Sequence, residues 1–214
     1  MARPRAADYE QQRDRILVLA VDAFARTGYA AASMAGLAQA CGISKATLYH
    51  YYSGKQALLF EALDRYTNRL IGIAERSAES ARAPRQALGD TLKALMAEYR
   101  HSRAYHVVLL QELKWLSAEQ RERIRAQQRA VVGRLGELID AVAPGAIAPA
   151  ERSAATMALL GMINFTFAWL RPEGPVSHER FAELAASLWL DGLTGQPPPS
   201  PEIDSHEQTV RIQG

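Results

Sequence analysis

Hydrophobic positions recur three and four residues apart along most of this chain, which is the period of an amphipathic α-helix. The pattern predicts a first helix from Asp8 to about Thr27, ended by Gly28, and a long helix from Lys55 to about Ala81. The predicted inner faces are Ile16, Ala20, Ala23, Phe24 and Thr27 in the first helix and Leu58, Leu59, Ala62, Leu63 and Tyr66 in the long one. No segment alternates convincingly with a period of two, so the fold is predicted to be all-α.

Two short helices are predicted between these long ones. Ser33 can cap the helix Met34–Ala40, and Ser44 can cap a helix that ends near Tyr51, because a serine hydroxyl accepts a hydrogen bond from the first turn. Gly42 supplies the turn between them. The second short helix is too polar for a core, and it carries groups that suit nucleic acid: Lys45, Thr47, Tyr49, His50 and Tyr51. A short polar helix after a glycine turn is typical of a helix-turn-helix, which predicts contact with DNA.

Pro84 interrupts the helical pattern and marks the start of a larger C-terminal part. Further helices are predicted near residues 85–101, 104–115, 118–142, 150–171 and 177–193. Residues 1–7 are predicted to be disordered, and so is the tail at 196–214, which holds four prolines and few apolar residues. The chain therefore divides into an N-terminal unit with the helix-turn-helix and a larger helical unit after it.

Composition narrows the class of partner. The 214 residues allow one large domain or two small ones, and a hydrophobic content of 48% is ample for a core. The net charge of +2 excludes a polybasic nucleic-acid binder. Residues 1–55, however, hold seven Lys and Arg against four Asp and Glu, so the positive excess lies at one end of the chain. This distribution favours contact with phosphates at that end.

Several classes of function find no support in the sequence. Cys41 is the only cysteine, so the chain forms no internal disulfide and no zinc cluster, and we predict no metal or cofactor. No phosphate loop, dinucleotide fingerprint or nucleophile motif is present, so we predict no enzyme. The apolar run from Ala154 to Leu170 falls short of the ~20 residues that span a bilayer. With no apolar N-terminal stretch, we predict a cytoplasmic protein without a membrane partner. The alternatives are an enzyme, or a helical small-molecule-binding or scaffolding protein, without a DNA function.

A dense series of residues between 16 and 63 carries a family resemblance. The series is Ile16-Leu17, Ala23-Phe24, Gly28-Tyr29, Ser33-Met34, Leu37-Ala38, Ala40-Cys41-Gly42-Ile43-Ser44-Lys45, Thr47-Leu48-Tyr49-His50-Tyr51-Tyr52, Lys55 and Leu58-Leu59. In order and spacing it resembles the TetR/AcrR family of transcriptional repressors. The resemblance implies an all-helical homodimer with a helix-turn-helix DNA-binding domain at 9–69 and a ligand-binding and dimerisation domain at 70–195. The chain departs from the family pattern at Gly36, Ala46 and Gly54.

Operator DNA is thus the expected partner of the third helix. Lys45 can read guanine O6 and N7, Thr47 can meet a base edge or a phosphate, and Ala46 can meet a thymine methyl. The resemblance implies phosphate contacts by Tyr49 and Lys55. The remaining expected positions are Ser33 beside a phosphate, the cap Ser44, and His50 and Tyr51 at the groove wall. Tyr51 fits a core position equally well, and Arg3, Arg5 and Arg13 either follow the minor groove or have no role.

The segment Gly161 to Gly174 resembles a subgroup of the same family that responds to acyl-CoA or aryl-CoA thioesters. This implies a small-molecule effector with an apolar arm and a polyanionic head. The expected ligand-binding residues are Tyr105, His106, Gln111, Trp115, Asn164, Phe165, Trp169 and Arg171, with Phe167 beside them. Phosphates could be met by Arg100, Arg103, Arg121, Arg125 and Arg129. Equally, Phe165 and Trp169 can simply pack between helices, and residues 119–129 can be a solvated face.

Two further expectations concern the last helices. Asn164 lies in an apolar helix, and burying an unpaired amide costs ~1–3 kcal/mol, so it needs a partner in ligand, water or another subunit. The last two helices carry more apolar residues than one subunit needs: Leu159, Met162, Ile163, Phe181, Leu184, Leu188 and Trp189. A four-helix bundle formed by two subunits would bury them, which predicts a homodimer.

Overall fold

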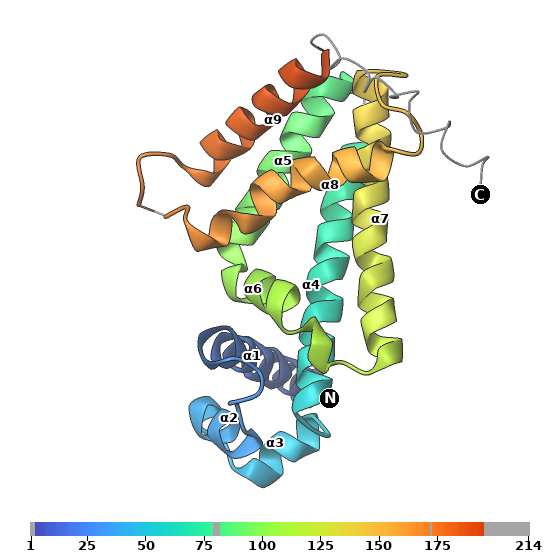
Figure 1. The fold of residues 1–214 in the computed structure, drawn as a ribbon. Helices are drawn as coiled ribbons and strands as arrows, with labels where there is room; N and C mark the ends of the chain where they lie inside the picture. Colours follow the sequence, from blue (N-terminus) through green and yellow to red (C-terminus); the bar gives the residue numbers. More distant parts are fainter. Residues whose placement is uncertain (1–2, 79–81, 172, 195–214) are drawn as a thin grey trace, which may run out of the picture.

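A computed structural model describes residues 3–78, 82–171 and 173–194, and within them the chain is helical with no strand. Figure 1 shows a small N-terminal unit below a taller helical one, with α4 running between them. The N-terminal helices are α1 (Arg3–Thr27), α2 (Met34–Cys41) and α3 (Lys45–Tyr51), followed by α4 (Lys55–Ala78). The others are α5 (Pro84–His101), α6 (Arg103–Gln111), α7 (Ala118–Val142), α8 (Arg152–Asn164) and α9 (His178–Thr194), with 3-10 turns at Leu113–Trp115 (η1) and Phe165–Ala168 (η2). The predicted all-α fold is confirmed.

The predicted capping residues account for the helix-turn-helix. Ser33 Oγ accepts a hydrogen bond from the N–H of Gly36 at 3.1 Å, and Ser44 Oγ accepts one from Thr47 at 3.0 Å. Gly42 has a φ of +67°, in the left-handed region where a side chain is disfavoured. Its N–H and the next one cap the end of α2. Local chemistry therefore sets the angle between α2 and α3.

α4 is the central element of the molecule. Its predicted inner face, from Leu58 to Tyr66, is completely buried against α1 in one unit and against α5 and α7 in the other. α5 packs in turn against α9, and α8 lies across the upper part of the bundle against α7 and α9 (Figure 1). Because one uninterrupted helix enters both cores, a displacement of α4 in the upper unit must reach the helix-turn-helix.

The helix boundaries differ from the sequence prediction in three places. α1 begins at Arg3 and not at Asp8, because Pro4 is tolerated in a first turn and Ala6 and Ala7 favour helix. Of its predicted inner face, Thr27 is exposed, and its hydroxyl donates to the carbonyl of Ala23. The predicted tail at 196–214 lies outside the described residues.

The other two differences lie at the ends of α6 and α8, where the helical pattern continues but the helix does not. α6 ends at Gln111, and the chain then turns through η1. α8 ends at Asn164, whose backbone carbonyl accepts a hydrogen bond from the His106 ring, and η2 follows. In both cases a tertiary contact overrides the local preference for helix. Within the described residues, no helix has the length and apolar character that crossing a membrane requires.

Candidate nucleic-acid interface and ligand cavity

α3 presents one polar face to solvent. Leu48 is completely buried and anchors the helix, while Lys45, Ala46, Thr47, Tyr49 and His50 are all exposed. The Lys45 ammonium lies 5.9 Å from the centre of the Tyr49 ring, so the cation and the aromatic side chain occupy one patch. Ser44 and Thr47 hydroxyls lie 2.8 Å apart and are both engaged in the cap. The first turn of α3 is therefore rigid and projects short side chains, as entry into a groove requires.

The aromatic residues at the end of α3 contact α1. Tyr51 is half-buried and stacks on Tyr9 with the ring centres 4.6 Å apart, and His50 meets the edge of the same ring at 6.2 Å. Tyr52 is buried, and burial together with the Glu61 charge raises its pKa to about 12 despite the opposing effect of Arg13. Tyr51 therefore has the packing role that the sequence left open.

Arg13 is engaged within the protein. Its guanidinium forms an ion pair with Glu61 at 2.7 Å and lies over the Tyr52 ring at 5.5 Å. Desolvation by burial lowers the pKa of Arg13, but the hydrogen bond to Glu61 and the charges of Glu61 and Tyr52 outweigh it, so the pKa is raised. The side chain ties α1 to α4 and is not available to follow a minor groove.

Lys55 donates to backbone carbonyls of the loop before α2. Its ammonium lies 2.7 Å from the carbonyl oxygens of both Tyr29 and Ala32, 3.4 Å from that of Ala30, and 4.2 Å from the centre of the Tyr29 ring. An ammonium has three hydrogens, and these contacts use them. The expected phosphate contact of Lys55 therefore competes with internal bonds and stays a prediction. Ser33, at the end of the same loop, is exposed beside the first turn of α2.

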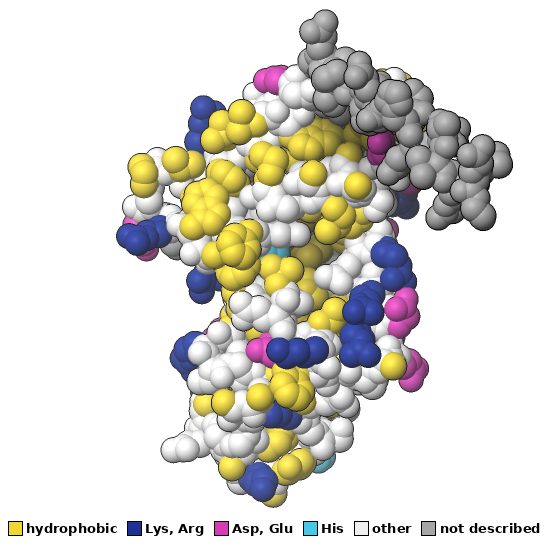
Figure 2. Space-filling model, in the orientation of Figure 1, with side chains coloured by type: hydrophobic (Ala, Val, Ile, Leu, Met, Phe, Trp, Pro, Cys, Tyr) yellow, Lys and Arg dark blue, Asp and Glu magenta, His cyan; other side chains and the backbone are white. Residues whose placement is uncertain are grey.

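A cavity of 610 Å³ lies between α4, α5, α6, α7 and α8. Its apolar lining includes Leu70, Leu109, Val131, Val132 and Leu160. Figure 2 shows apolar side chains in a hollow below α8 and Lys and Arg side chains along its α7 side. Gly133 borders the same space, and a β-carbon at this position would meet nothing within 4 Å, so α7 leaves room there. The size is typical of a small-molecule site.

Three arginines border the outer part of this cavity. Arg125 is exposed and makes no direct ion pair among the described residues. Arg129 pairs with Glu122 at 2.5 Å, with both side chains about 60% exposed, and such solvated pairs are worth little. Arg152 is half-buried and pairs with Asp140. The opening of an apolar cavity thus carries positive charge suited to phosphate groups.

The inner wall carries a hydrogen-bonded cluster of polar side chains. His106 contacts the Tyr66 hydroxyl with Nδ1 at 3.1 Å and the Asn164 carbonyl with Nε2 at 2.9 Å, and it stacks on Tyr99 with ring centres 4.0 Å apart. The Tyr99 hydroxyl donates to Asn164 Oδ1 at 2.8 Å. Burial lowers the pKa of His106 and raises those of Tyr66 and Tyr99, so all three are uncharged near neutral pH. The partner that Asn164 was expected to need is Tyr99, within the same chain.

The structure brings only part of the expected ligand site together. His106 and Asn164 line the cavity, and so do Arg125 and Arg129. The other expected residues do not line the cavity. Trp115 stacks on Tyr29, and Tyr105 packs beside Tyr66. The remaining four are exposed, Phe165 at 61% and Trp169 at 52%, together with Gln111 and Arg171. The cavity therefore does not lie along the aromatic face of the Gly161–Gly174 segment. Residues that sequence reasoning missed are Thr67, Tyr99, Gln128, Arg152 and Thr156.

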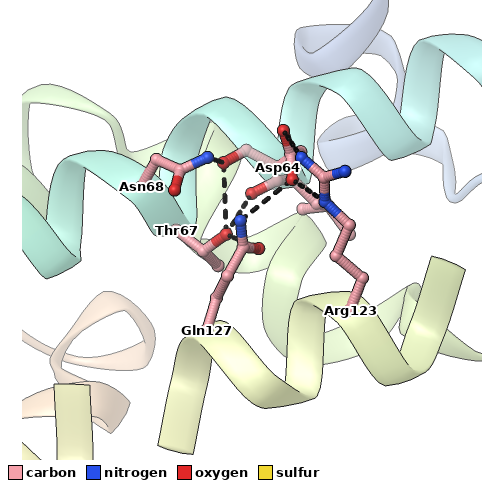
Figure 3. A network of polar contacts seen from close by, with 6 residues as sticks. Asp64, Thr67, Asn68, Arg123 and Gln127 are labelled. Atoms are coloured by element: carbon pink, nitrogen blue, oxygen red, sulfur yellow. Dashed lines mark hydrogen bonds and ion pairs between the residues drawn. The ribbon is translucent and has the colours of Figure 1, made fainter. Parts of the chain in front are cut away.

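Polar contacts join the cavity wall to α4. Figure 3 shows Arg123 and Gln127 of α7 converging on Asp64 of α4. Arg123 donates two hydrogen bonds to the Asp64 carboxylate at 2.8 and 3.1 Å, and Gln127 donates one at 2.9 Å. Thr67, which lines the cavity, donates to Gln127 Oε1 at 2.6 Å. A change in the cavity near Thr67 therefore reaches the α4–α7 contact directly.

A second connection runs through η1. Trp115 stacks on Tyr29 with ring centres 5.5 Å apart, and its backbone carbonyl accepts a hydrogen bond from Gln56 at 2.9 Å. Tyr29 is the residue whose carbonyl and ring contact Lys55. α6, which lines the cavity through His106 and Leu109, thus leads directly into a contact with the helix-turn-helix unit.

Within the described residues, an all-helical fold combines a helix-turn-helix with a ligand-sized cavity and two connections between them, an architecture that suits a DNA-binding regulator. Family models agree: residues 16–62 match the bacterial regulatory proteins of the tetR family, and residues 81–193 match the tetracyclin repressor-like C-terminal domain. The second match alone covers more than half of the chain, and the chain belongs to the TetR family of transcriptional regulators.

The relatives and solved structures below match most of this chain and nearly all of their own length. The HTH-type transcriptional repressor KstR2 of Mycolicibacterium smegmatis is 26% identical over 189 residues, covering 86% of this chain and 91% of the relative. A TetR-family transcriptional regulator from Bordetella parapertussis is 32% identical, with a TM-score of 0.80 over 87% of this chain and 98% of that one. AibR, solved in complex with isovaleryl coenzyme A and operator DNA, is 24% identical, with a TM-score of 0.73 over 83% and 97%, and it shares the fold.

Proposed function

We propose that this protein is a homodimeric repressor that binds a palindromic operator through α3 and is released by an acyl-CoA or aryl-CoA thioester. The observation that carries the effector class is the apolar cavity with Arg125, Arg129 and Arg152 at its opening. An acyl group would occupy the interior, and the phosphates of coenzyme A would meet the guanidinium groups. AibR, which shares the fold, was solved with a CoA thioester and operator DNA, and KstR2 is a repressor by name.

The dimer would form through α8 and α9. Leu184 and Leu188 are exposed on α9, at 42% and 60%, and Figure 2 shows apolar side chains gathered over these two helices. An apolar groove between α8 and α9, lined by Met162, Leu188 and Trp189, continues this surface. Leu159 and Ile163, which were also expected at the interface, are buried within the single chain. Two copies joined here would present two α3 helices to successive half-sites.

Release would follow from a shift between two arrangements of the bundle. A ligand bound against Thr67 and His106 would favour one position of α4 relative to α7, and α4 begins directly after the helix-turn-helix. The coupling between ligand and DNA is expected to be ~1–3 kcal/mol and reciprocal, so operator DNA must weaken ligand binding by the same factor.

A gel shift with the DNA upstream of the protein's own gene tests the DNA function. We expect binding to a palindromic site, and the Lys45→Ala variant should lose ~1–3 kcal/mol at one base position and discriminate less there. Lys93→Ala, far from α3 on α5, is the matched control. If Lys45→Ala loses the same affinity for operator and for random DNA, Lys45 contacts only a phosphate. Binding of a single asymmetric half-site by a monomer would contradict the operator model.

Calorimetry with octanoyl-CoA and phenylacetyl-CoA, with the free acids and coenzyme A as controls, tests the effector class. Binding of a thioester should lower operator affinity in the gel shift. If no thioester binds, or if binding leaves the gel shift unchanged, the effector assignment is wrong while the DNA function stands.

A further inference from the structure

The polar side chains on the inner wall of the cavity have a hydrogen-bonding pattern that can be resolved atom by atom. A backbone carbonyl only accepts, so His106 Nε2, 2.9 Å from the Asn164 carbonyl oxygen, must carry the ring hydrogen. Nδ1 of the neutral ring is then an acceptor, and the Tyr66 hydroxyl donates to it at 3.1 Å. Both nitrogens of His106 are thus used within the protein.

The hydroxyls of Thr67 and Tyr99 also donate within the protein. The Thr67 hydroxyl lies 2.6 Å from Gln127 Oε1 and 2.8 Å from the Leu63 carbonyl, and its single hydrogen is used there. The Tyr99 hydroxyl donates to Asn164 Oδ1 at 2.8 Å. This bond orients the Asn164 amide, because its oxygen faces Tyr99 and its nitrogen therefore faces the other way.

Among His106, Thr67, Tyr99 and Asn164, the one polar group left without a bond inside the protein is Asn164 Nδ2. It carries two hydrogens, and it has no hydrogen-bond partner among the residues that the structure describes. Asn164 is half-buried and borders the cavity, whose lining also includes the apolar side chains of Leu109 and Leu160. A donor in such surroundings is satisfied only by water or by an acceptor on a ligand, and displacing the water without replacing its bond costs affinity.

We infer that the cavity selects an acyl or aryl group that carries a hydrogen-bond acceptor, such as a keto oxygen, at its inner end, and that Asn164 Nδ2 recognises this acceptor. The inference rests on the proposed thioester effector and adds the chemistry of its acyl group. The guanidinium groups at the opening hold the head of the ligand whatever its acyl chain, so discrimination among acyl groups falls to the inner wall. An unsubstituted alkyl end packs as well against Leu160 but leaves the amide hydrogens unpaired.

The test is calorimetry with matched pairs of thioesters. Hexanoyl-, octanoyl- and decanoyl-CoA are each compared with the same chain bearing a keto group at the penultimate carbon. Three lengths are used so that one places the oxygen at Asn164. For the best-fitting length, we expect the keto compound to bind about tenfold more tightly, as one recovered hydrogen bond allows.

Three variants assign the effect to the amide. Asn164→Leu should reduce the preference to less than about twofold, and so should Asn164→Leu combined with Tyr99→Phe, in which no hydroxyl is left unpaired. Asn68→Leu, the same change at an exposed position outside the cavity, should keep the full preference. Thermal melting confirms that each variant is folded.

Each outcome decides between the two proposals. Equal binding of keto and plain chains by the unaltered protein overturns the inference and leaves the thioester effector in place. A keto preference that persists in both Asn164 variants overturns the role of Asn164. Absence of binding by every thioester overturns the effector class, and the inference falls with it.

Discussion

At the scale of single residues, Lys55 contacts the loop before the helix-turn-helix from within the protein. Its ammonium connects α4 to the loop that sets the start of α2, through the carbonyls of Tyr29 and Ala32. The loop in turn positions Ser33 and the helix-turn-helix. We therefore expect Lys55 to act by holding this loop.

Replacing Lys55 with Met should lower the melting temperature, because hydrogen bonds from a charged donor are worth about 1.5–3 kcal/mol. Operator affinity should fall as well, while the slope of affinity against salt concentration stays unchanged. Differential scanning fluorimetry and salt titrations of binding measure the two effects. A slope reduced by about one unit with an unchanged melting temperature would instead identify a free phosphate contact.

His106 gives the protein a predictable response to acid. Burial lowers its pKa in the folded protein, with the Asn164 carbonyl acting in the opposite direction, whereas the unfolded chain has a pKa of about 6.5. Between the two values the unfolded state binds more protons, so stability is lost as the pH falls below about 6.5. The slope from one histidine cannot exceed about 1.4 kcal/mol per pH unit. Burial also lowers the pKa of His178, aided by Arg100, and its contribution has the same sign.

Urea unfolding of the unaltered protein and of His106→Gln between pH 7.5 and 5.5 measures this contribution. The variant should be less stable at pH 7.5 but should lose less stability on acidification. His101→Gln, at an exposed position on α5, is the control and should follow the unaltered protein. Parallel pH profiles for all three proteins would mean that His106 does not titrate on unfolding.

Only some of the residues that line the cavity could be predicted from the sequence. Asn164 was singled out because a polar residue in an apolar helix needs a partner, and His106 as one of several polar groups suited to a pocket; both line the cavity. Tyr99 and Thr67 were missed because they read as ordinary core positions of a helix. α7 did carry a signal: Arg125, Gln128, Arg129, Val132, Gly133 and Gly136 follow one another at helical spacing, so small and polar residues occupy a face that should pack.

At the scale of helices, caps were predictable and interruptions were not. The caps at Ser33, Gly42 and Ser44 form hydrogen bonds with residues a few positions away, so they can be predicted from the local sequence. The ends of α6 and α8 depend on partners far along the chain: Gln56 and Tyr29 hold η1, and His106 holds the last carbonyl of α8. The aromatic run after Asn164 continues the helical period, and nothing in the local sequence marks an end of α8 there.

The contact between α4 and α7 should carry the signal from ligand to DNA. Arg123→Met removes both hydrogen bonds to Asp64 while leaving the cavity lining unchanged. We expect the variant to bind thioester and operator separately, but with the coupling between them reduced by at least half of its ~1–3 kcal/mol. Operator titrations with and without saturating thioester give the coupling energy.

Arg134→Met, which removes an arginine further along α7, serves as the control for the change in charge. If the Arg123→Met variant keeps the full coupling energy, the coupling must instead pass through the contact of η1 with Tyr29, the other connection between the two units.

At the scale of the whole molecule, the helix-turn-helix lies at one end and α9 near the other, with α8 crossing the upper unit (Figure 1). A dimer formed through α8 and α9 would therefore set the distance between the two helix-turn-helix units. The division of the sequence at residue 69 stays a prediction, because α4 passes through it without interruption.

Leu188→Glu should produce a monomer, because a charge at the centre of an apolar interface cannot be desolvated without a partner. We expect the variant to keep its melting temperature within a few degrees and to keep thioester binding, but to lose high-affinity operator binding. Light scattering after size-exclusion chromatography gives the mass. Ala118→Glu, exposed at the start of α7, is the control for the added charge, and a dimeric Leu188→Glu variant would place the interface elsewhere.

Trp115 stands where the cavity unit touches the helix-turn-helix, with its indole N–H on Glu112 and its ring against Tyr29. The chain has three tryptophans, and the other two, Trp169 and Trp189, lie beyond α8 and on α9. The junction therefore carries its own fluorophore. With Trp169 and Trp189 replaced by Phe, the emission of Trp115 alone would follow the separation of η1 from Tyr29 in a stopped-flow instrument, so the order of ligand capture, domain movement and DNA release becomes measurable without attaching any dye.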